Sequence, residues 1–408
     1  MFCKPVAAAH NRIALKLDLH RFTKAIPGTQ SNTLTYSLFT DAAALPTRWD
    51  LLAEPNVLLS RAYLAVLQKA APENMQCHFI GLYKNNSLCG IALAQYINLG
   101  NIKTFAGSGK AFSAQNYLVK RFSSHIIVIG NNTITGQNAF LHSDDISRRE
   151  ALALLQDSIK DLQEQYRRKC ININMVVIKD FDAQPEPDIM EAAGGFHQFS
   201  AQPNMVFSVK DNWQTMADYT AELNKKYRTQ YNRARKKAEG IEKRLLSETE
   251  ISQHNARIHE LYLTVAENAS FNTFYLPVNH FEVFKQQLGD DFLFRGYFLD
   301  EQLVGFNTLI KNNNQFEAYF LGYDAAVQKE KMLYLNMLYD FVETAISLQT
   351  GKVILGRSAM EIKSSVGAQA EQAFGFIKHT HPLLNLFTSS LFEYFEPKTE
   401  WIARNPFK

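Results

Sequence analysis

Three strand patterns in a row, followed by an apolar helix and one more strand, restrict the fold of this chain more than any other feature. The strand patterns cover residues 292–299, 303–311 and 316–323. Tight turns join them, and turns this short connect antiparallel neighbours, so the three predict a meander. A helix at 333–348 and a buried strand at 352–356 come next. This order predicts an α/β (α+β) domain in which helices flank a mixed, mostly antiparallel central sheet.

The rest of the chain repeats the same kinds of element, and 408 residues are too many for one ordinary core. Before residue 200 we expect strands at 34–39, 78–83, 88–99, 124–130 and 171–178 and helices at 56–70 and 148–166. After it we expect a strand at 205–209, a long helical region at 213–239, a strand at 241–246 and a helix at 252–268. Prolines at 182–187 and glycines at 194–195 mark a crossover between them. We therefore predict a tail at 1–33, one domain at 34–200 and a second at 201–408.

Composition excludes several classes of protein. With 46% hydrophobic and 20% charged residues the chain can bury a core, and a net charge of +3 leaves attraction to polyanions to local patches. No P-loop, dinucleotide fingerprint, Ser/His/Asp arrangement or metal-ligand spacing is present, so we expect no metal and no permanently bound cofactor. The four cysteines form no CxxC pair, and buried free thiols in a reducing compartment are favoured over a disulfide between Cys77 and Cys89.

Two observations bear on location. The N-terminus lacks the apolar core of a signal peptide, and no run approaches the ~20 apolar residues of a membrane span. The segment 382–395 is short and apolar, and either packs on its own domain or lies on a bilayer. We expect a cytoplasmic protein, with peripheral contact at the inner membrane face as the open alternative.

The densest local feature is the basic run at 225–237, KKYRTQYNRARKK. In a helix, a spacing of seven places Arg228 and Arg235 on one face, with Tyr231 three residues after the first. Arginines so placed can hold phosphate through charge-assisted, bidentate hydrogen bonds. A solvated helix surface explains the same residues equally well.

A second feature follows the strand at 352–356 and reads GRSAMEIKSSVG. It places Arg357, Glu361 and Lys363 at the carboxyl end of a strand, where open α/β sheets bind ligands. A carboxylate such as Glu361 can take a proton from an attacking amine, and Arg357 or Lys363 can hold a phosphate or a developing oxyanion. A structural salt bridge is the alternative explanation for Glu361 and Lys363.

A third group consists of tyrosines and asparagines on the meander and the following helix: Asn307, Tyr319, Tyr323, Tyr334 and Asn336. Alternation along a strand places Tyr319 and Tyr323 on one face. Buried tyrosines mostly complete cores, so a structural role competes with catalysis at each of these positions.

The basic helix and the LGRSAMEIKSSVGA stretch together resemble the tandem GNAT-fold proteins related to the FemAB peptidoglycan aminoacyltransferases, over roughly residues 35–395. That group includes GNAT-like N-acyltransferases of lipid and envelope synthesis. The resemblance implies amide formation, in which an amine attacks a thioester or an aminoacyl-tRNA ester. It also implies that Arg357 and Lys363 bind phosphate of the donor or acceptor.

One departure from the resemblance concerns the donor. Acetyl-CoA enzymes of this fold place a glycine-rich pyrophosphate loop after the fourth strand, whereas residues 325–332, AAVQKEKM, contain no glycine. A carrier protein or a long-chain acyl-CoA therefore becomes the favoured donor over acetyl-CoA.

We accordingly predict an N-acyltransferase that moves an acyl group from acyl-CoA or acyl carrier protein to the amine of a lipid or envelope precursor. The predicted roles are proton acceptor for Glu361, leaving-group assistance for Tyr323 or Tyr334, and binding for Arg357, Lys363, Arg228 and Arg235. We place Tyr231, Asn307, Tyr319 and Asn336 on the same binding surface. The alternatives are a FemAB-type aminoacyltransferase, whose basic helix would contact tRNA, and a non-catalytic binding protein.

Overall fold

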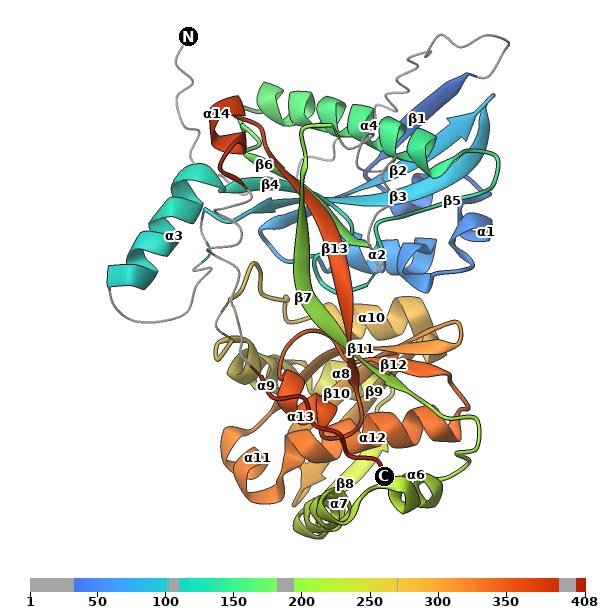
Figure 1. Cartoon of the computed structure of the whole chain (residues 1–408), viewed down its shortest axis with the longest axis vertical. Coiled ribbons are helices and arrows are strands. Elements are labelled where there is room, and N and C mark those ends of the chain that lie inside the picture. Colours follow the sequence, from blue (N-terminus) through green and yellow to red (C-terminus); the bar gives the residue numbers. More distant parts are fainter. Residues whose placement is uncertain are drawn as a thin grey trace.

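The computed structural model describes residues 33–100, 102, 110–136, 138–181, 194–269, 271–388 and 401–408. The predicted tail at 1–33 lies outside these residues except for its last position. We use "N-terminal half" for the elements up to β6 and "C-terminal half" for α6 to β12, and Figure 1 shows these halves as two lobes joined by two long strands.

The N-terminal half alternates helices and strands. Its elements are β1 (Leu34–Phe39), α1 (Trp49–Ala53), α2 (Arg61–Lys69), β2 (Met75–Lys84), β3 (Ser87–Asn98), α3 (Lys110–Phe122), β4 (His125–Ile129), β5 (Phe140–His142), α4 (Arg148–Arg168) and β6 (Met175–Phe181). Strand β7 (His197–Ser208) then leads into the other half.

The C-terminal half follows the same scheme. Its elements are α6 (Met216–Glu222), α7 (Lys225–Lys237), β8 (Glu242–Leu245), α8 (Glu248–Gln253), α9 (Asn255–Ala266), α10 (His280–Leu288), β9 (Phe292–Leu299), β10 (Gln302–Asn312), β11 (Gln315–Tyr323), α11 (Ala325–Lys331), α12 (Leu333–Ser347) and β12 (Lys352–Ile354). The chain ends with α13 (Met360–Ser364), β13 (Gln369–His379) and α14 (Pro382–Asn385).

All the strands form one sheet with a symmetric order. The order is β1-β2-β3-β4-β6-β13-β7-β12-β11-β10-β9-β8, with β5 beside β3. Counted from one edge of the sheet, the order is β1, β2, β3, β4, β6 and β13. Counted from the other edge, it is β8, β9, β10, β11, β12 and β7, so each strand of one half has a counterpart at the same position in the other. The halves are thus two copies of one arrangement related by a pseudo-twofold axis between β7 and β13.

The two central strands are exchanged between the halves. β7 follows β6 along the chain but pairs with β12, and β13 follows β12 but pairs with β6. β7 and β13 pair with each other along most of their length, and Figure 1 shows them crossing from one lobe to the other. The division that we predicted at residue 200 falls inside β7.

Buried apolar side chains join the halves as well as filling each one. One cluster contains Tyr63 and Leu67 of α2 together with Phe281 and Phe284 of α10. The rings of Tyr63 and Phe284 lie 5.7 Å apart, edge to face. The two halves therefore share a core through α2 and α10 as well as sharing a sheet.

The mixed, mostly antiparallel sheet and the meander are confirmed, but two helix predictions are wrong and one long strand was missed. The helix predicted at 213–239 is two helices, because the Asn224 side chain caps a new helix by accepting from the backbone N–H of Tyr227. The helix predicted at 252–268 likewise begins earlier and is broken at His254. β13 was not predicted, because its first half is polar and lacks a strand pattern.

Candidate active site

The strands β11 and β12 part midway along their length. They are parallel and pair from Gln315 to Glu317 on β11, but β11 continues to Tyr323 while the chain leaves β12 after Ile354. Leu355 instead bonds to Met205 of β7, with its N–H 2.8 Å from the Met205 carbonyl oxygen. Parting parallel strands open a crevice beyond their carboxyl ends, where α/β sheets bind ligands.

Lys363 lies at this opening and has no carboxylate partner among the described residues. Its Nζ donates to the carbonyl oxygens of Leu355, at 2.5 Å, and Gly356, at 3.3 Å. The residue is only 4% exposed, and burial lowers the pKa of its amine to about 7. An ammonium in such surroundings gains strongly from any negative charge that develops beside it.

Arg357 reaches from the same loop to the N-terminal half. Its Nη2 donates to the carboxylate of Asp180 on β6, and Lys179 lies 3.1 Å from the other carboxylate oxygen. Asp180 is 2% exposed, and the buried Nε of Arg357 has no partner among the described residues. Arg357 and Lys179 thus share one buried carboxylate at the junction between the halves.

Glu361 has a different partner. Its Oε1 accepts hydrogen bonds from Arg404, with Nε at 3.1 Å, and about half of its side chain is exposed. Arg357, Glu361 and Lys363 were predicted to act together after β12. Each has a different partner, namely Asp180, Arg404 and backbone carbonyl groups, respectively. Only Lys363 and Arg357 lie next to the opening, and Glu361 keeps its predicted role solely as a proposal.

Tyr323 and Tyr334 are brought together beside the opening. Tyr323 ends β11, Tyr334 begins α12, and their ring centroids lie 6.3 Å apart. Burial raises the pKa of both hydroxyls, so they keep their protons at neutral pH. Tyr334 packs on the same hydrophobic cluster as Met360 and Ile362 of α13, the helix that carries Lys363.

Two arginines of the basic helix, Arg228 and Arg235, are occupied by protein partners. Arg228 donates to the carbonyl oxygens of Thr220, Ala221 and Leu223, which end α6. Arg235 donates to Asp340 of α12 at 2.6 Å and to Glu343 at 3.1 Å. Both guanidinium groups therefore hold α7 in place.

Asp340 is the centre of a buried network that sequence reasoning missed. It is 1% exposed and also accepts from Lys243 at 2.9 Å and from the Tyr297 hydroxyl at 2.7 Å. Burial opposes its ionisation, but the neighbouring cations outweigh burial and hold its pKa below the ordinary value. The available signal was a lone aspartate in the apolar run LYLNMLYDFVETAIS, since such a carboxylate needs a cation; the basic helix supplies Arg235 and β8 supplies Lys243.

The remaining predicted residues divide between the two faces of the sheet. Tyr231 and Asn336 accompany Arg235, which stacks over the Tyr231 ring at 5.3 Å and donates to Asn336 Oδ1 at 3.3 Å. Asn307 donates to Tyr297 at 2.9 Å. Tyr319 packs on the opposite face of the sheet from Tyr323, so the prediction that the two share a face is wrong, because the β10–β11 register shifts between Asn307 and Leu309. The Tyr319 hydroxyl lies 3.0 Å from Nε2 of His280.

The stretch without glycine, residues 325–332, forms α11 and ends in a left-handed residue, Met332, with φ 52°. Helix α12 begins immediately afterwards. Met332, the residue before it, makes no side-chain hydrogen bond to the first backbone N–H groups of the helix. The equivalent helix α4 is different, because Ser147 and Glu150 form a capping box at its start. The segment after β11 thus ends in a helix start without a side-chain cap.

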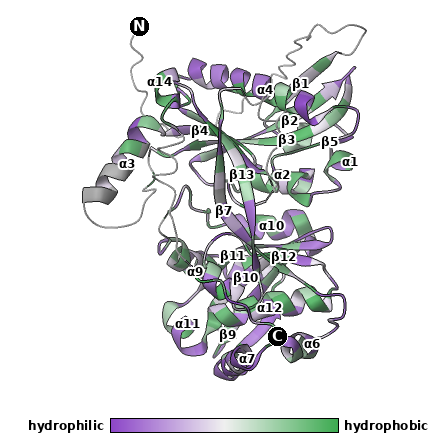
Figure 2. Cartoon of the chain, in the orientation of Figure 1, coloured by the Kyte–Doolittle hydropathy of each residue, from purple (hydrophilic) through white to green (hydrophobic). Residues whose placement is uncertain are grey.

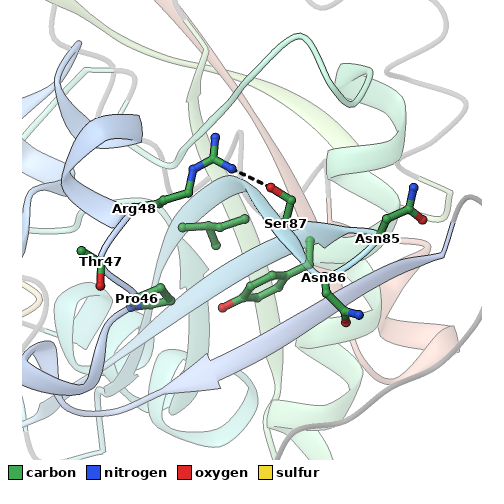
Figure 3. A pocket seen from close by; sticks show the side chains of 8 residues that line it. Pro46, Thr47, Arg48, Asn85, Asn86 and Ser87 are labelled. Atoms are coloured by element: carbon green, nitrogen blue, oxygen red, sulfur yellow. Dashed lines mark hydrogen bonds between the residues drawn. The ribbon is translucent and has the colours of Figure 1, made fainter.

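A separate depression lies at the far edge of the sheet. Figure 3 shows it between the β2–β3 turn and the segment before α1, where Arg48 donates to Ser87 at 2.6 Å. None of the predicted site residues lines it. Within the described part of the chain there is no cluster of metal-ligating side chains and no helix long and apolar enough to span a membrane. Cys77 and Cys89 are buried free thiols, as predicted.

Comparison with models of known families gives no match to the sequence, and comparison with curated proteins gives none either. Solved structures do match. FemX superposes with a TM-score of 0.50 at 13% identity, covering 86% of this chain and 98% of FemX. A tandem GNAT protein from the clavulanic acid biosynthesis pathway gives 0.50 at 12% identity, over 86% of this chain and 99% of the other.

The chain has the tandem GNAT fold. The resemblance inferred from the basic helix and the strand-end stretch is confirmed at the level of fold. In GNAT terms, the two halves are two GNAT units, and the point where β11 and β12 part lies in the second.

Proposed function

We propose that the protein is an N-acyltransferase that uses a thioester donor, acyl-CoA or acyl carrier protein, to acylate the amine of a lipid or cell-envelope precursor. The observation that carries this proposal is the buried, carboxylate-free Lys363 at the point where β11 and β12 part. Burying an amine without a counter-charge is costly, and such residues concentrate where chemistry needs them.

The donor would lie along the β11–β12 opening. Coenzyme A and acyl carrier protein both present phosphopantetheine, whose phosphate suits the uncapped start of α12. Because α11 replaces a glycine-rich loop, fewer free backbone N–H groups are left for a pyrophosphate. This favours a carrier protein or a long acyl chain, which contribute contacts of their own.

The transfer step needs three changes: C–N bond formation, C–S bond cleavage and loss of a proton from nitrogen. It begins when the acceptor nitrogen attacks the thioester carbonyl carbon. Protonated Lys363 would stabilise the oxyanion, and Tyr323 or Tyr334 would give a proton to the leaving sulfur and recover it from solvent. Glu361 is our proposed proton acceptor, and Arg357 would hold an anionic group of the substrate.

A FemAB-type transfer from aminoacyl-tRNA is the second candidate. It is favoured by the outer face of α7, where five cations are exposed and none forms an ion pair within the described residues: Lys225, Lys226, Arg233, Lys236 and Lys237. Figure 2 shows this helix as hydrophilic along its length. Such a face attracts a phosphate backbone, and binding through it falls steeply with salt.

The test is to offer the purified protein acyl-CoA of several chain lengths, acyl carrier protein or aminoacyl-tRNA, each with a panel of amines, and to follow products by mass spectrometry. We expect amide product from a long-chain thioester, strongly reduced in Lys363→Met and unchanged in Lys225→Gln. Product from aminoacyl-tRNA alone, lost in the α7 variant, would select the second candidate.

Two further outcomes test the residue roles. A Glu361→Gln variant with full activity would remove Glu361 from the mechanism while leaving the rest of the proposal standing. If no donor turns over but a lipid co-purifies with the protein, the fold serves binding without chemistry.

A further inference from the structure

One end of the N-terminal half exposes an apolar surface that the proposed chemistry does not use. It is formed by the end of α3 and by the turn and helix after β13. Six large apolar side chains lie on it, each at least 37% exposed: Tyr117, Leu118, Phe122, Leu383, Leu386 and Phe387. We call these residues the apolar end patch.

The two parts of the apolar end patch are held together by hydrogen bonds. The ring of His379, at the end of β13, donates from Nε2 to the Phe122 carbonyl oxygen at 3.0 Å. The side chain of Asn385 in α14 caps this junction, with Oδ1 accepting from the His379 N–H at 2.8 Å. Figure 1 places α14 beside the end of α4 and the start of β6, above α3. The patch is therefore one surface built from segments far apart in the sequence.

Among the described residues next to the apolar end patch, the charges are mostly positive. Neither 110–122 nor 376–388 contains an aspartate or glutamate, whereas Lys120 and Arg121 are exposed between the apolar residues of α3. Thr380 bonds to the Asn174 carbonyl oxygen, which brings the end of α4 to the same surface, and there Arg168 and Lys169 are exposed. The carboxylate of Glu164 offsets part of that charge.

We propose that the apolar end patch docks the protein on a bilayer that contains anionic lipids. Exposed aromatic and leucine side chains with interspersed cations match an interfacial site, where apolar groups enter the headgroup region and Lys and Arg contact lipid phosphates. A soluble protein partner would need matching carboxylates and a shaped apolar face, whereas a bilayer accepts convex, short helices such as α14. This inference does not depend on the proposed reaction.

The experiment is sedimentation of the full-length protein with vesicles of phosphatidylcholine, with and without about a third phosphatidylglycerol. We expect binding to the anionic vesicles, weakened about tenfold or more in a Leu383→Gln, Leu386→Gln, Phe387→Gln triple variant. A matched control, Leu51→Gln, Ile402→Gln, changes side chains that are 72% and 63% exposed elsewhere and should bind normally.

Charge is tested separately. Lys120→Gln, Arg121→Gln should weaken binding to anionic vesicles, and Lys225→Gln, Lys226→Gln on α7 should not. The proposal is overturned if the triple variant binds as well as the wild type, if the α7 variant abolishes binding, or if neutral vesicles bind equally. It is also overturned if the wild type binds no vesicles and ultracentrifugation shows a dimer that the triple variant lacks.

Discussion

Helices α4 and α12 occupy equivalent places in the two halves, yet one is sealed and the other is open. Ser147 and Glu150 satisfy the first N–H groups of α4 with their own side chains, whereas α12 starts after a left-handed residue with no such cap. The interior of α4 buries Ser158, which bonds to its own helix, while α12 buries Asp340 among cations from other elements. The two copies of the fold therefore differ at the start of this helix and in the polar groups that the helix buries.

The two halves also differ at the point where the parallel strands beside these helices stop pairing. In the N-terminal half, β4 and β6 part after Ile129 and Ile178, and the space is occupied by polar side chains that bond to one another, such as Asn131 and Thr133. In the C-terminal half, the opening holds Lys363 instead. This difference is why the proposed chemistry is placed in the C-terminal half.

The strongest way to break this comparison is to remove the lysine beside each opening. We expect Lys363→Met to lower the transfer rate by about 100-fold, as the loss of one oxyanion donor does. Lys179→Met, beside the N-terminal opening, should change the rate by no more than a few-fold. The comparison fails if steady-state kinetics show equal losses for the two variants.

The buried polar groups of the two helices offer a test of stability. Asp340→Ala leaves Arg235 and Lys243 without their shared carboxylate, and we expect a loss of about 3–5 kcal/mol in the free energy of unfolding. Ser158→Ala removes a bond within one helix and should cost about 1 kcal/mol. Urea denaturation measures both, and similar losses would mean that α12 is no more dependent on its polar core than α4.

The pH dependence of stability tests the burial of Lys363. Its pKa is about 7 in the folded protein against 10.5 for a free lysine, so between these values the unfolded chain binds more protons. The folded state should then gain about 1.4 kcal/mol per pH unit in that window, relative to Lys363→Met. Unfolding curves of both proteins at pH 6, 7, 8 and 9 measure the difference, and a constant difference would place Lys363 in contact with water.

The smallest expected effect concerns the capping box. Ser147→Ala should cost about 1 kcal/mol, because it frees N–H groups at the start of α4. Thr229→Ala, whose hydroxyl bonds to its own helix on the surface of α7, is the matched control and should cost less. If the two are equal in thermal unfolding, the seal on α4 contributes little and the contrast with α12 is weaker than the geometry indicates.

The sequence was sufficient for the parts of the fold that depend on local pattern. The β9–β10–β11 meander and the helix after it follow from alternation, turn residues and apolar periodicity. β13 could not be found in this way, because its polar residues Gln369 and Glu371 face β7 in a pairing set by the exchange between halves. The break at Asn224 was visible only as an asparagine that can cap a helix.

The candidate site was predictable in residue type and only partly in geometry. Lys363 and Arg357 were predicted as site residues because they follow the end of β12. In the structure, both lie near the point where β12 parts from β11. The partners of Arg235 and Arg357 were missed, since Asp340 and Asp180 come from distant elements and no local spacing connects them. Which charged residues pair across the fold depends on the topology of the chain. The spacing of charges along the sequence does not specify that topology.

The exchange of β7 and β13 has a consequence for any attempt to shorten the chain. A protein cut before residue 369 would leave β6 and β7 with bare hydrogen-bonding edges in the middle of the molecule rather than at its rim. Such edges recruit the matching strand from another copy, so truncated chains should intertwine or aggregate instead of yielding a working monomeric half.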